Sequence, residues 1–400
     1  MKRIIIGCII ILLIIVVGII LTSRKSTSKS GGNLNQEMKS IITEFVEKNK
    51  SVRSCVLAVM KGDSSFSWSG AVGIASQENQ LPMTENTPIY LASVTKLFTA
   101  TAIMRLYELG LISLDDPMSK YLPEKLIHGV QIYKGIDYSD KITIKELLSH
   151  TSGIPDYYEE KPQGGKNFFE ILLENQDHSW TPDEEISRAR DDLSPKFEPG
   201  TDASYSDTNF QLLGKIIEVI TGKPLHMVYE EFFFLPLGLK NTWLTGGSTT
   251  QPTLSVPAAD VFYKNINITK MRSNGSYWAD GGMVSTVDDM IIFLKALNEG
   301  RIVSKETLKL MKHWHKLHQF PLLYGFGIMY IKLPWYLNMM MKMPSIYGHS
   351  GTTGSFLYYS EEMDLYLAGS INLTETGLMP KSIILMQKVM KAIQNKTNAK

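Results

Sequence analysis

The chain has 400 residues, of which 44% are apolar, 20% charged and 10% aromatic, and this composition excludes a mostly disordered or fibrous protein. The formal net charge is +1, and without Lys2 and Arg3 the remaining 39 basic residues are set against 40 acidic ones. No concentrated basic face is indicated, so we expect no nucleic-acid partner.

The N-terminus carries the first predicted element, an uninterrupted apolar run of 18 residues from Ile4 to Leu21. As a helix this run would measure about 27 Å, close to the thickness of a bilayer core. A cleaved signal peptide is the alternative, although no small-residue cleavage site precedes Arg24. We expect an uncleaved transmembrane anchor at residues 1–21, a Ser/Gly-rich linker at 22–35 and a catalytic body at 36–398.

Apolar periodicity and turn residues predict the elements of this body in chain order. They are a helix at 35–49, strands at 52–60 and 66–74, helices at 93–110, 143–149, 208–221 and 286–298, strands at 324–331, 355–359 and 365–371, and a helix at 379–393. Strands at both ends and helices between them predict an α+β fold, with one antiparallel sheet built from the two chain ends, flanking helices and an inserted helical lobe.

Two further features of the sequence are an apolar stretch near the C-terminus and a pair of cysteines. Residues 333–344 are unusually apolar for a loop, and they indicate either packing against the core or lobe, or a lip that touches substrate or membrane. Cys8 lies in the apolar N-terminal run and Cys55 in a predicted core strand, so we expect no disulfide between them.

The first chemical motif is Ser93-Val94-Thr95-Lys96 at the start of a predicted helix. Residues three apart lie on one helical face, so the Lys96 amine can reach the Ser93 hydroxyl. A lysine whose pKa is lowered by burial can take the proton of a serine nucleophile, and the helix N-terminus offers N–H groups to an oxyanion. Ser-x-x-Lys also occurs by chance in many proteins of this length.

Two more short motifs follow, and each has a structural alternative. Tyr205-Ser206-Asp207 precedes a predicted helix, where Asp207 could simply be a capping residue. His349-Ser350-Gly351 ends a predicted strand and is followed by Thr352, a pattern that a glycine-rich hairpin with a surface histidine would also produce.

Together and in this order, the motifs resemble the signatures of the serine β-lactamase and penicillin-binding-protein superfamily, in particular its class C, D-alanyl-D-alanine carboxypeptidase and esterase branch. The segments 147–153, 197–200 and 281–286 resemble connecting segments of that branch. The resemblance extends from about residue 40 to residue 395.

The resemblance implies roles for the matching residues. Ser93 would be acylated, and Lys96 and Tyr205 would handle its proton. Backbone N–H groups of Ser93 and Thr352 would bind the oxyanion, and His349 would line the pocket. No metal and no organic cofactor would be needed.

Asp207, His349, Gly351 and Thr352 are the substrate-binding candidates, and two of them depart from the family pattern. Asp207 stands where the family usually has Asn, and His349 where β-lactamases usually have Lys. A carboxylate and a neutral imidazole would attract a substrate carboxylate weakly, whereas the carboxylate would attract an ammonium group. His150 is expected to be a structural turn residue.

The leading prediction is a membrane-anchored, extracytoplasmic serine hydrolase that cleaves peptide or ester bonds of cell-envelope D-amino acids, like a penicillin-binding carboxypeptidase. Its partner would be a small peptide or ester substrate derived from the cell wall. The alternatives are a general carboxylesterase, a D-alanyl esterase or D-aminopeptidase, and a non-catalytic penicillin-binding sensor or scaffold. The substrate implied by the family would place the N-terminus inside the cell and the body outside.

Overall fold

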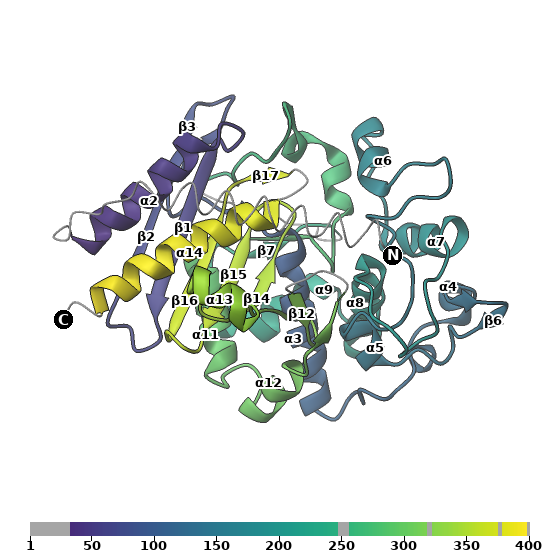
Figure 1. Cartoon of the computed structure of the whole chain (residues 1–400). Helices are drawn as coiled ribbons and strands as arrows, with labels where there is room; N and C mark the ends of the chain where they lie inside the picture. Colours follow the sequence, from purple (N-terminus) through teal and green to yellow (C-terminus); the bar gives the residue numbers. More distant parts are fainter. Residues whose placement is uncertain (1–32, 247–255, 318–321, 375–377, 398–400) are drawn as a thin grey trace.

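The two ends of the chain meet in one antiparallel sheet of nine strands (Figure 1). The computed structural model describes residues 33–246, 256–317, 322–374 and 378–397. The N-terminal strand β1 (Ser54–Lys61) pairs with β2 (Ser67–Ser76) on one side and with the C-terminal strand β16 (Leu365–Ser370) on the other. The predicted α+β fold, with a sheet built from both chain ends, is confirmed.

The other six strands complete the sheet in the order β11-β12-β13-β14-β15-β16-β1-β2-β3. They are β3 (Leu81–Pro82), β11 (His315–Lys316), β12 (Leu322–Tyr324), β13 (Met329–Ile331), β14 (Ile346–Ser350) and β15 (Phe356–Ser360).

Both faces of the sheet are covered, which explains why β1 is apolar along most of its length. Cys55, Leu57 and Val59 face a core shared with the terminal helices α2 (Leu34–Lys48) and α14 (Leu378–Thr397). Val56 and Ala58 alternate with them and face a larger core, to which α11 (Val287–Asn298) also contributes. Successive side chains of a strand point to opposite faces, so two covered faces require a continuous apolar run.

A helical lobe is inserted between β4 (Ile89–Tyr90) and β10 (Met283–Ser285), which pair with each other (Figure 1). Its longest members are α3 (Thr95–Glu108) and α8 (Asp207–Thr221), which pack together. Nearly every residue of α3 is buried, as expected for a helix that lies at the centre of a protein and is covered on all sides.

The shorter elements link these parts. In the lobe they are α4 (Glu124–Ile127), α5 (Ile144–Leu148), α6 (Phe168–Glu174), α7 (Pro182–Asp192), α9 (Leu225–Tyr229), α10 (Leu235–Leu237), β5 (Ile132–Tyr133), β6 (Ile136–Asp137), β7 (Trp243–Leu244), β8 (Phe262–Tyr263) and β9 (Ile266–Asn267). Nearer the C-terminus are α12 (Lys305–Met311), α13 (Trp335–Met341) and β17 (Leu373–Thr374).

One sequence prediction is wrong in the C-terminal third. The strand expected at 324–331 is divided into β12 and β13 by a turn at 325–328. Gly327 in that turn has φ +67°, and a Cβ there would come within 2.1 Å of the Ala100 Cβ, so the turn packs directly on α3. The apolar stretch 333–344 contains α13 and packs partly on the core, as one of its two interpretations predicted: Met343 is buried, whereas Trp335 and Met339 are exposed.

The transmembrane helix that was part of the fold prediction is corrected here. Among the described residues, no helix is both long enough and apolar enough to cross a membrane. The predicted anchor at residues 1–21 and most of the predicted linker at 22–35 lie outside the described residues.

Candidate active site

Ser93 lies at the junction between a strained turn and a long helix. It belongs to a single 3₁₀ turn (Ala92–Val94) that runs directly into α3. Ala92 has φ +44°, in the left-handed region that costs a non-glycine residue about 1–3 kcal/mol. The turn places the Ser93 side chain at the wall of a pocket, ahead of the helix N-terminus.

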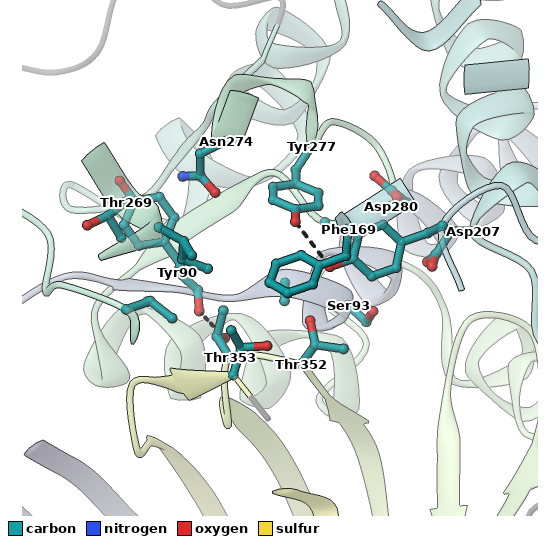
Figure 2. A pocket seen from close by; sticks show the side chains of 16 residues that line it. Tyr90, Ser93, Phe169, Asp207, Thr269, Asn274, Tyr277, Asp280, Thr352 and Thr353 are labelled. Atoms are coloured by element: carbon teal, nitrogen blue, oxygen red, sulfur yellow. Dashed lines mark hydrogen bonds between the residues drawn. The ribbon is translucent and has the colours of Figure 1, made fainter. Parts of the chain in front are cut away.

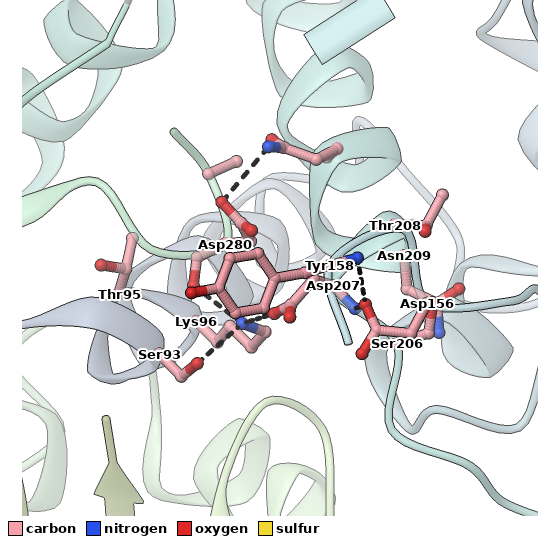
Figure 3. A network of polar contacts seen from close by, with 12 residues as sticks. Ser93, Thr95, Lys96, Asp156, Tyr158, Ser206, Asp207, Thr208, Asn209 and Asp280 are labelled. Carbon is pink, nitrogen blue, oxygen red and sulfur yellow. Dashed lines mark hydrogen bonds and ion pairs between the residues drawn. The ribbon is translucent and has the colours of Figure 1, made fainter. Parts of the chain in front are cut away.

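Lys96 occupies the first turn of α3 and is completely buried. Its ammonium group donates to Ser93 Oγ at 3.2 Å and to the Asp280 carbonyl oxygen at 2.8 Å, and it forms an ion pair with Asp207 Oδ1 (Figure 3). An ammonium has three N–H donors, and here each of them has an acceptor.

The charge state of Lys96 differs from the sequence-based expectation. Burial alone would lower the pKa of this lysine, but the charges of Asp207 and Asp280 outweigh burial and raise it above the usual value. Lys96 is therefore an ammonium at neutral pH, and its resting form has no lone pair to offer to Ser93.

Asp207 is the first residue of α8, and its side chain is turned away from a capping role. Its carboxylate reaches Lys96, while its backbone N–H donates to Asp156 Oδ1 at 3.2 Å. The positive end of the α8 dipole and the Lys96 ammonium both stabilise a carboxylate at this position. The Asp207 side chain is only 8% exposed, so water screens the ion pair weakly.

Further carboxyl groups surround this ion pair. Burial, followed by the charge of Asp207, raises the pKa of Asp280 to about 6 and that of Asp156 well above its usual value. Tyr157 Oη donates to Asp280 Oδ2 at 2.7 Å. Glu185 is also buried, and the Gln211 amide donates to both Glu185 and Asp280. Burial is the main cause that raises the pKa of Glu185 well above its usual value.

Tyr205 is held in place by rings rather than by its hydroxyl group. Its ring lies 4.3 Å from that of His150, whose Nδ1 accepts the backbone N–H of Ser206 at 3.1 Å. Burial and then the charge of Asp207 raise the pKa of Tyr205 far above its usual value, and the neighbouring Ser93 hydroxyl does not reverse this. Tyr205 is therefore a neutral phenol, whereas His150 lies behind it as a buried support.

His349 lies on β14 and is also neutral. Its Nδ1 is 2.8 Å from the Ser350 carbonyl oxygen and must carry the hydrogen, so Nε2 accepts from Tyr324 Oη at 3.0 Å. Burial, and then the charge of Lys96, lowers the pKa of His349 to about 3. His349 is completely buried and does not line the pocket, although it lies near Tyr205.

Gly351 and Thr352 follow β14 and bring the edge of the sheet to the nucleophile. A Cβ at Gly351 would lie 2.3 Å from the Leu91 carbonyl oxygen, so only glycine permits this close approach to the turn that carries Ser93. Thr352 lines the pocket beside Ser93 (Figure 2). Among the described residues, the backbone N–H of Thr352 donates to no carbonyl oxygen, as the expected oxyanion role requires.

The pocket extends from Ser93 between aromatic walls (Figure 2). It encloses about 580 Å³, part of which is open to solvent. Tyr158 and Tyr277, whose hydroxyl groups are 3.1 Å apart, form one wall. Tyr90 and Phe169 add two further rings. Among the described residues that line the pocket there is no lysine, arginine or histidine, whereas Asp207 and Asp280 both contribute to it.

The structure therefore brings Ser93, Lys96, Tyr205 and Asp207 together, with Thr352 beside Ser93 (Figure 2). The sequence motifs did not include Asp280 or the wall formed by Tyr158 and Tyr277. Asp280 directly precedes the Gly281-Gly282 pair, and that position was the one local signal for it. Tyr158 and Tyr277 come from distant loops, and no local pattern connects them.

Comparisons with known proteins identify the family and several similar chains. The family model described as beta-lactamase matches residues 38–387. D-alanyl-D-alanine-carboxypeptidase/endopeptidase AmpH of Escherichia coli (strain K12) is 30% identical over 196 residues, 49% of this chain and 47% of that protein. Penicillin-binding protein 4* of Bacillus subtilis (strain 168) is 26% identical over 331 residues, 80% of this chain and 67% of that protein. The chain thus spans about half the length of the first relative.

A solved structure extends the likeness over nearly the whole body. D-amino acid amidase from Ochrobactrum anthropi SV3, complexed with L-phenylalanine amide, has a TM-score of 0.75 and 26% identity. The match covers 92% of this chain and 100% of that one.

Proposed function

This chain belongs to the beta-lactamase family and is a serine hydrolase, and we propose that it cleaves D-amino-acid amide, peptide or ester bonds through an acyl-enzyme on Ser93. The proposed substrate is uncharged or cationic beside the scissile bond. The observation that carries this proposal is the lining of the pocket, which contains two carboxyl groups and no basic side chain among the described residues.

The proposed reaction gives each of the groups in the site one step. Ser93 Oγ, 3.2 Å from Lys96 Nζ, attacks the substrate carbonyl carbon. The backbone N–H groups of Ser93 and Thr352 bind the resulting oxyanion. Tyr205, a neutral phenol, gives its hydrogen to the leaving group and takes one from Lys96, so that the proton lost by Ser93 reaches that group and Tyr205 remains a phenol. Water then hydrolyses the ester on Ser93.

The charge of the site favours an ammonium over a carboxylate substrate. Lys96 is buried and already paired with Asp207, and His349 is neutral at physiological pH. A substrate carboxylate would therefore meet Asp207 and Asp280 with no basic side chain of the pocket wall to balance them. The aromatic walls suit an apolar or aromatic side chain on the acyl group.

A second candidate is a carboxypeptidase that removes a terminal D-alanine. The similarity to the carboxypeptidase/endopeptidase AmpH favours it. Because the carboxypeptidase candidate would act on D-alanine bonds of the cell envelope, the proposal includes a location of the catalytic body outside the cytoplasm. Cell fractionation with an epitope on the C-terminus tests that location.

The test compares four substrates on the full-length protein, with Ser93→Ala as the control. They are D-phenylalanine amide, its L enantiomer, N-acetyl-D-phenylalanine amide and a peptide that ends in D-Ala-D-Ala with a free carboxylate. We expect kcat/KM for D-phenylalanine amide to exceed that for the other three by about tenfold or more. Preference for the free carboxylate would favour the carboxypeptidase, and equal turnover by the Ser93→Ala variant would refute the nucleophile.

A further inference from the structure

The ion pair between Lys96 and Asp207 raises a question about proton transfer in the proposed acylation. All three donors of the Lys96 ammonium are directed at acceptors, namely Ser93 Oγ, Asp207 Oδ1 and the Asp280 carbonyl oxygen. A group without a lone pair cannot accept the proton of Ser93. Lys96 must therefore lose a proton before or while Ser93 attacks.

The neighbouring groups leave one acceptor for that proton. The Asp280 carbonyl is an amide oxygen and a very weak base, and Ser93 is the group to be deprotonated. Tyr205 is a phenol that already carries its proton. Asp207 Oδ1 is a carboxylate oxygen in direct contact with Lys96 Nζ and at most 8% exposed.

We propose that Asp207 is the terminal proton acceptor of a Ser93–Lys96–Asp207 relay. This inference rests on the acyl-enzyme mechanism proposed above and assigns a catalytic role to the residue that replaces the usual asparagine. An asparagine at this position could accept a hydrogen bond from Lys96 but could not take its proton.

The relay conserves atoms and charge at each step. One Nζ–H bond of Lys96 breaks and an O–H bond forms on Asp207 Oδ1, while Nζ takes the proton of Ser93. Ser93 Oγ bonds to the carbonyl carbon, and the π electron pair of the carbonyl moves to the oxygen. When the bond to the leaving group breaks, Lys96 protonates that group directly or through Tyr205, and Asp207 returns its proton to Lys96. No co-reactant is required.

The relay predicts a particular dependence on pH. The tautomer with a neutral amine and a protonated Asp207 contains as many protons as the resting ion pair, so the wild-type protein need not release a proton to solvent. In Asp207→Asn that option is absent, and Lys96 must first lose its proton to solvent. The rate of attack by Ser93 should then rise about tenfold per pH unit below the pKa of Lys96 in that variant.

Other titrating groups also face the relay, and their effect on the pH profile must be distinguished from that of Lys96 and Asp207. They are Asp156 and Glu159 from the loop after α5, Glu185 from α7, Asp280 before β10, His150, His349, and the tyrosines at 157, 158, 205, 277 and 324. Asp280, whose pKa is raised to about 6, changes its charge just below neutral pH. Loss of the Asp207 charge would lower the pKa of Asp280, so Asp280 is ionised in both wild type and Asp207→Asn between pH 7 and pH 9, and the ratio of their rates over that range is the informative quantity.

The test measures the rate at which a fluorophosphonate probe labels Ser93 in the full-length protein. The probe reports activation of the serine and does not depend on the natural substrate, so failure of the relay and failure of the proposed substrate class are distinguishable. We expect an almost flat profile for wild type between pH 7 and pH 9. In Asp207→Asn the charge of Asp280 still raises the pKa of Lys96 against the effect of burial. We therefore expect labelling of this variant to be about 10–100-fold slower at pH 7 and to approach wild type as the pH rises.

Two further measurements test the relay even if Asp207→Asn does not fold. Asp207→Glu retains a carboxylate and should restore the flat profile even if its rate is lower. For wild type, the labelling rate in mixtures of light and heavy water should indicate two protons in transfer. Parallel profiles of wild type and Asp207→Asn, or a single transferred proton in wild type, would overturn the relay.

Discussion

The buried ion pair between Lys96 and Asp207 can be tested by its effect on stability. The two side chains are 0% and 8% exposed, so removal of one partner leaves the other charge in a poorly solvated place. Lys96→Met removes the ammonium but keeps a side chain of similar length. The stranded Asp207 carboxylate then lies near Asp280 and Asp156, and we expect unfolding to become easier by about 3–5 kcal/mol.

A second substitution should reverse part of this loss. Asp207→Asn in the Lys96→Met background removes the stranded charge and keeps the shape of the side chain. We expect the double variant to be more stable than Lys96→Met alone by about 1–3 kcal/mol, although it carries more changes. Urea denaturation at pH 8, where isolated carboxyl groups are ionised, measures all four free energies of unfolding of the cycle.

An exposed ion pair provides the matched control. Lys48 and Glu44 are also paired, but their side chains are 60% and 52% exposed. Lys48→Met and Glu44→Gln should each have little effect, and their coupling should stay below about 0.5 kcal/mol. If the losses of Lys96→Met and Asp207→Asn simply add in the double variant, the buried pair is not coupled and the reasoning fails.

Three further outcomes follow from single positions. Gly327→Ala should lower the free energy of unfolding in urea by about 2–4 kcal/mol, because the new Cβ would collide with Ala100. In the control Gly110→Ala the φ is similar and no atom lies within 4 Å of the new Cβ, so the loss should be about 1 kcal/mol. Equal losses would contradict the packing argument. The pKa of His349 is lowered to about 3 from 6.5, so protonation of this histidine favours the unfolded state and destabilises wild type as the pH falls. Between pH 6.5 and pH 3 the free energy of unfolding of wild type should therefore fall by up to roughly 4 kcal/mol more than that of His349→Gln. Identical acid profiles of the two proteins would contradict the low pKa of His349. Burial raises the pKa of Cys55 to about 12, so a maleimide reagent followed by peptide mass mapping should label it only after unfolding, and rapid labelling of the native protein would contradict its burial.

Local sequence signals were sufficient for the long elements of the fold. The β1–β2 hairpin has a continuous apolar run followed by a turn, and α3 and α8 end near Gly110 and Gly222, whose positive φ angles terminate the helices. The break between β12 and β13 was missed because it depends on contact between Gly327 and Ala100, which lie far apart in the chain. Very short strands such as β4 exist through pairing with distant segments, and periodicity cannot detect them.

The site shows the same division between local and distant information. The spacing of Ser93 and Lys96 predicted their contact, because three residues on a helix determine it. Asp207 was expected to face the substrate, and it does line the pocket, but no sequence pattern indicated that its Oδ1 also pairs with Lys96, whose pKa is raised instead of lowered. The sequence does not specify which of several buried carboxyl groups meets the ammonium, because that depends on how α8 packs on α3.

The protonation state of Asp280 determines the net charge of the pocket beside Ser93, called here the pocket floor. Lys96 and Asp207 together are neutral, so the charge beside Ser93 depends on Asp280, whose pKa is raised to about 6. Below that pH Asp280 is protonated and the floor is neutral, whereas above it the floor carries one negative charge. An ammonium substrate should therefore bind more tightly as the pH rises from 5 to 7, whereas its N-acetylated analogue should not respond.

The Michaelis constant provides the measurement, because it isolates this attraction when binding is faster than chemistry. For D-phenylalanine amide, KM should fall severalfold over this range in wild type and stay constant in Asp280→Asn, whose backbone carbonyl can still accept from Lys96. If the fall persists in Asp280→Asn, another group sets the charge of the floor. If KM rises with pH in wild type, the substrate is not attracted as an ammonium, and the preference for cationic acyl donors is wrong.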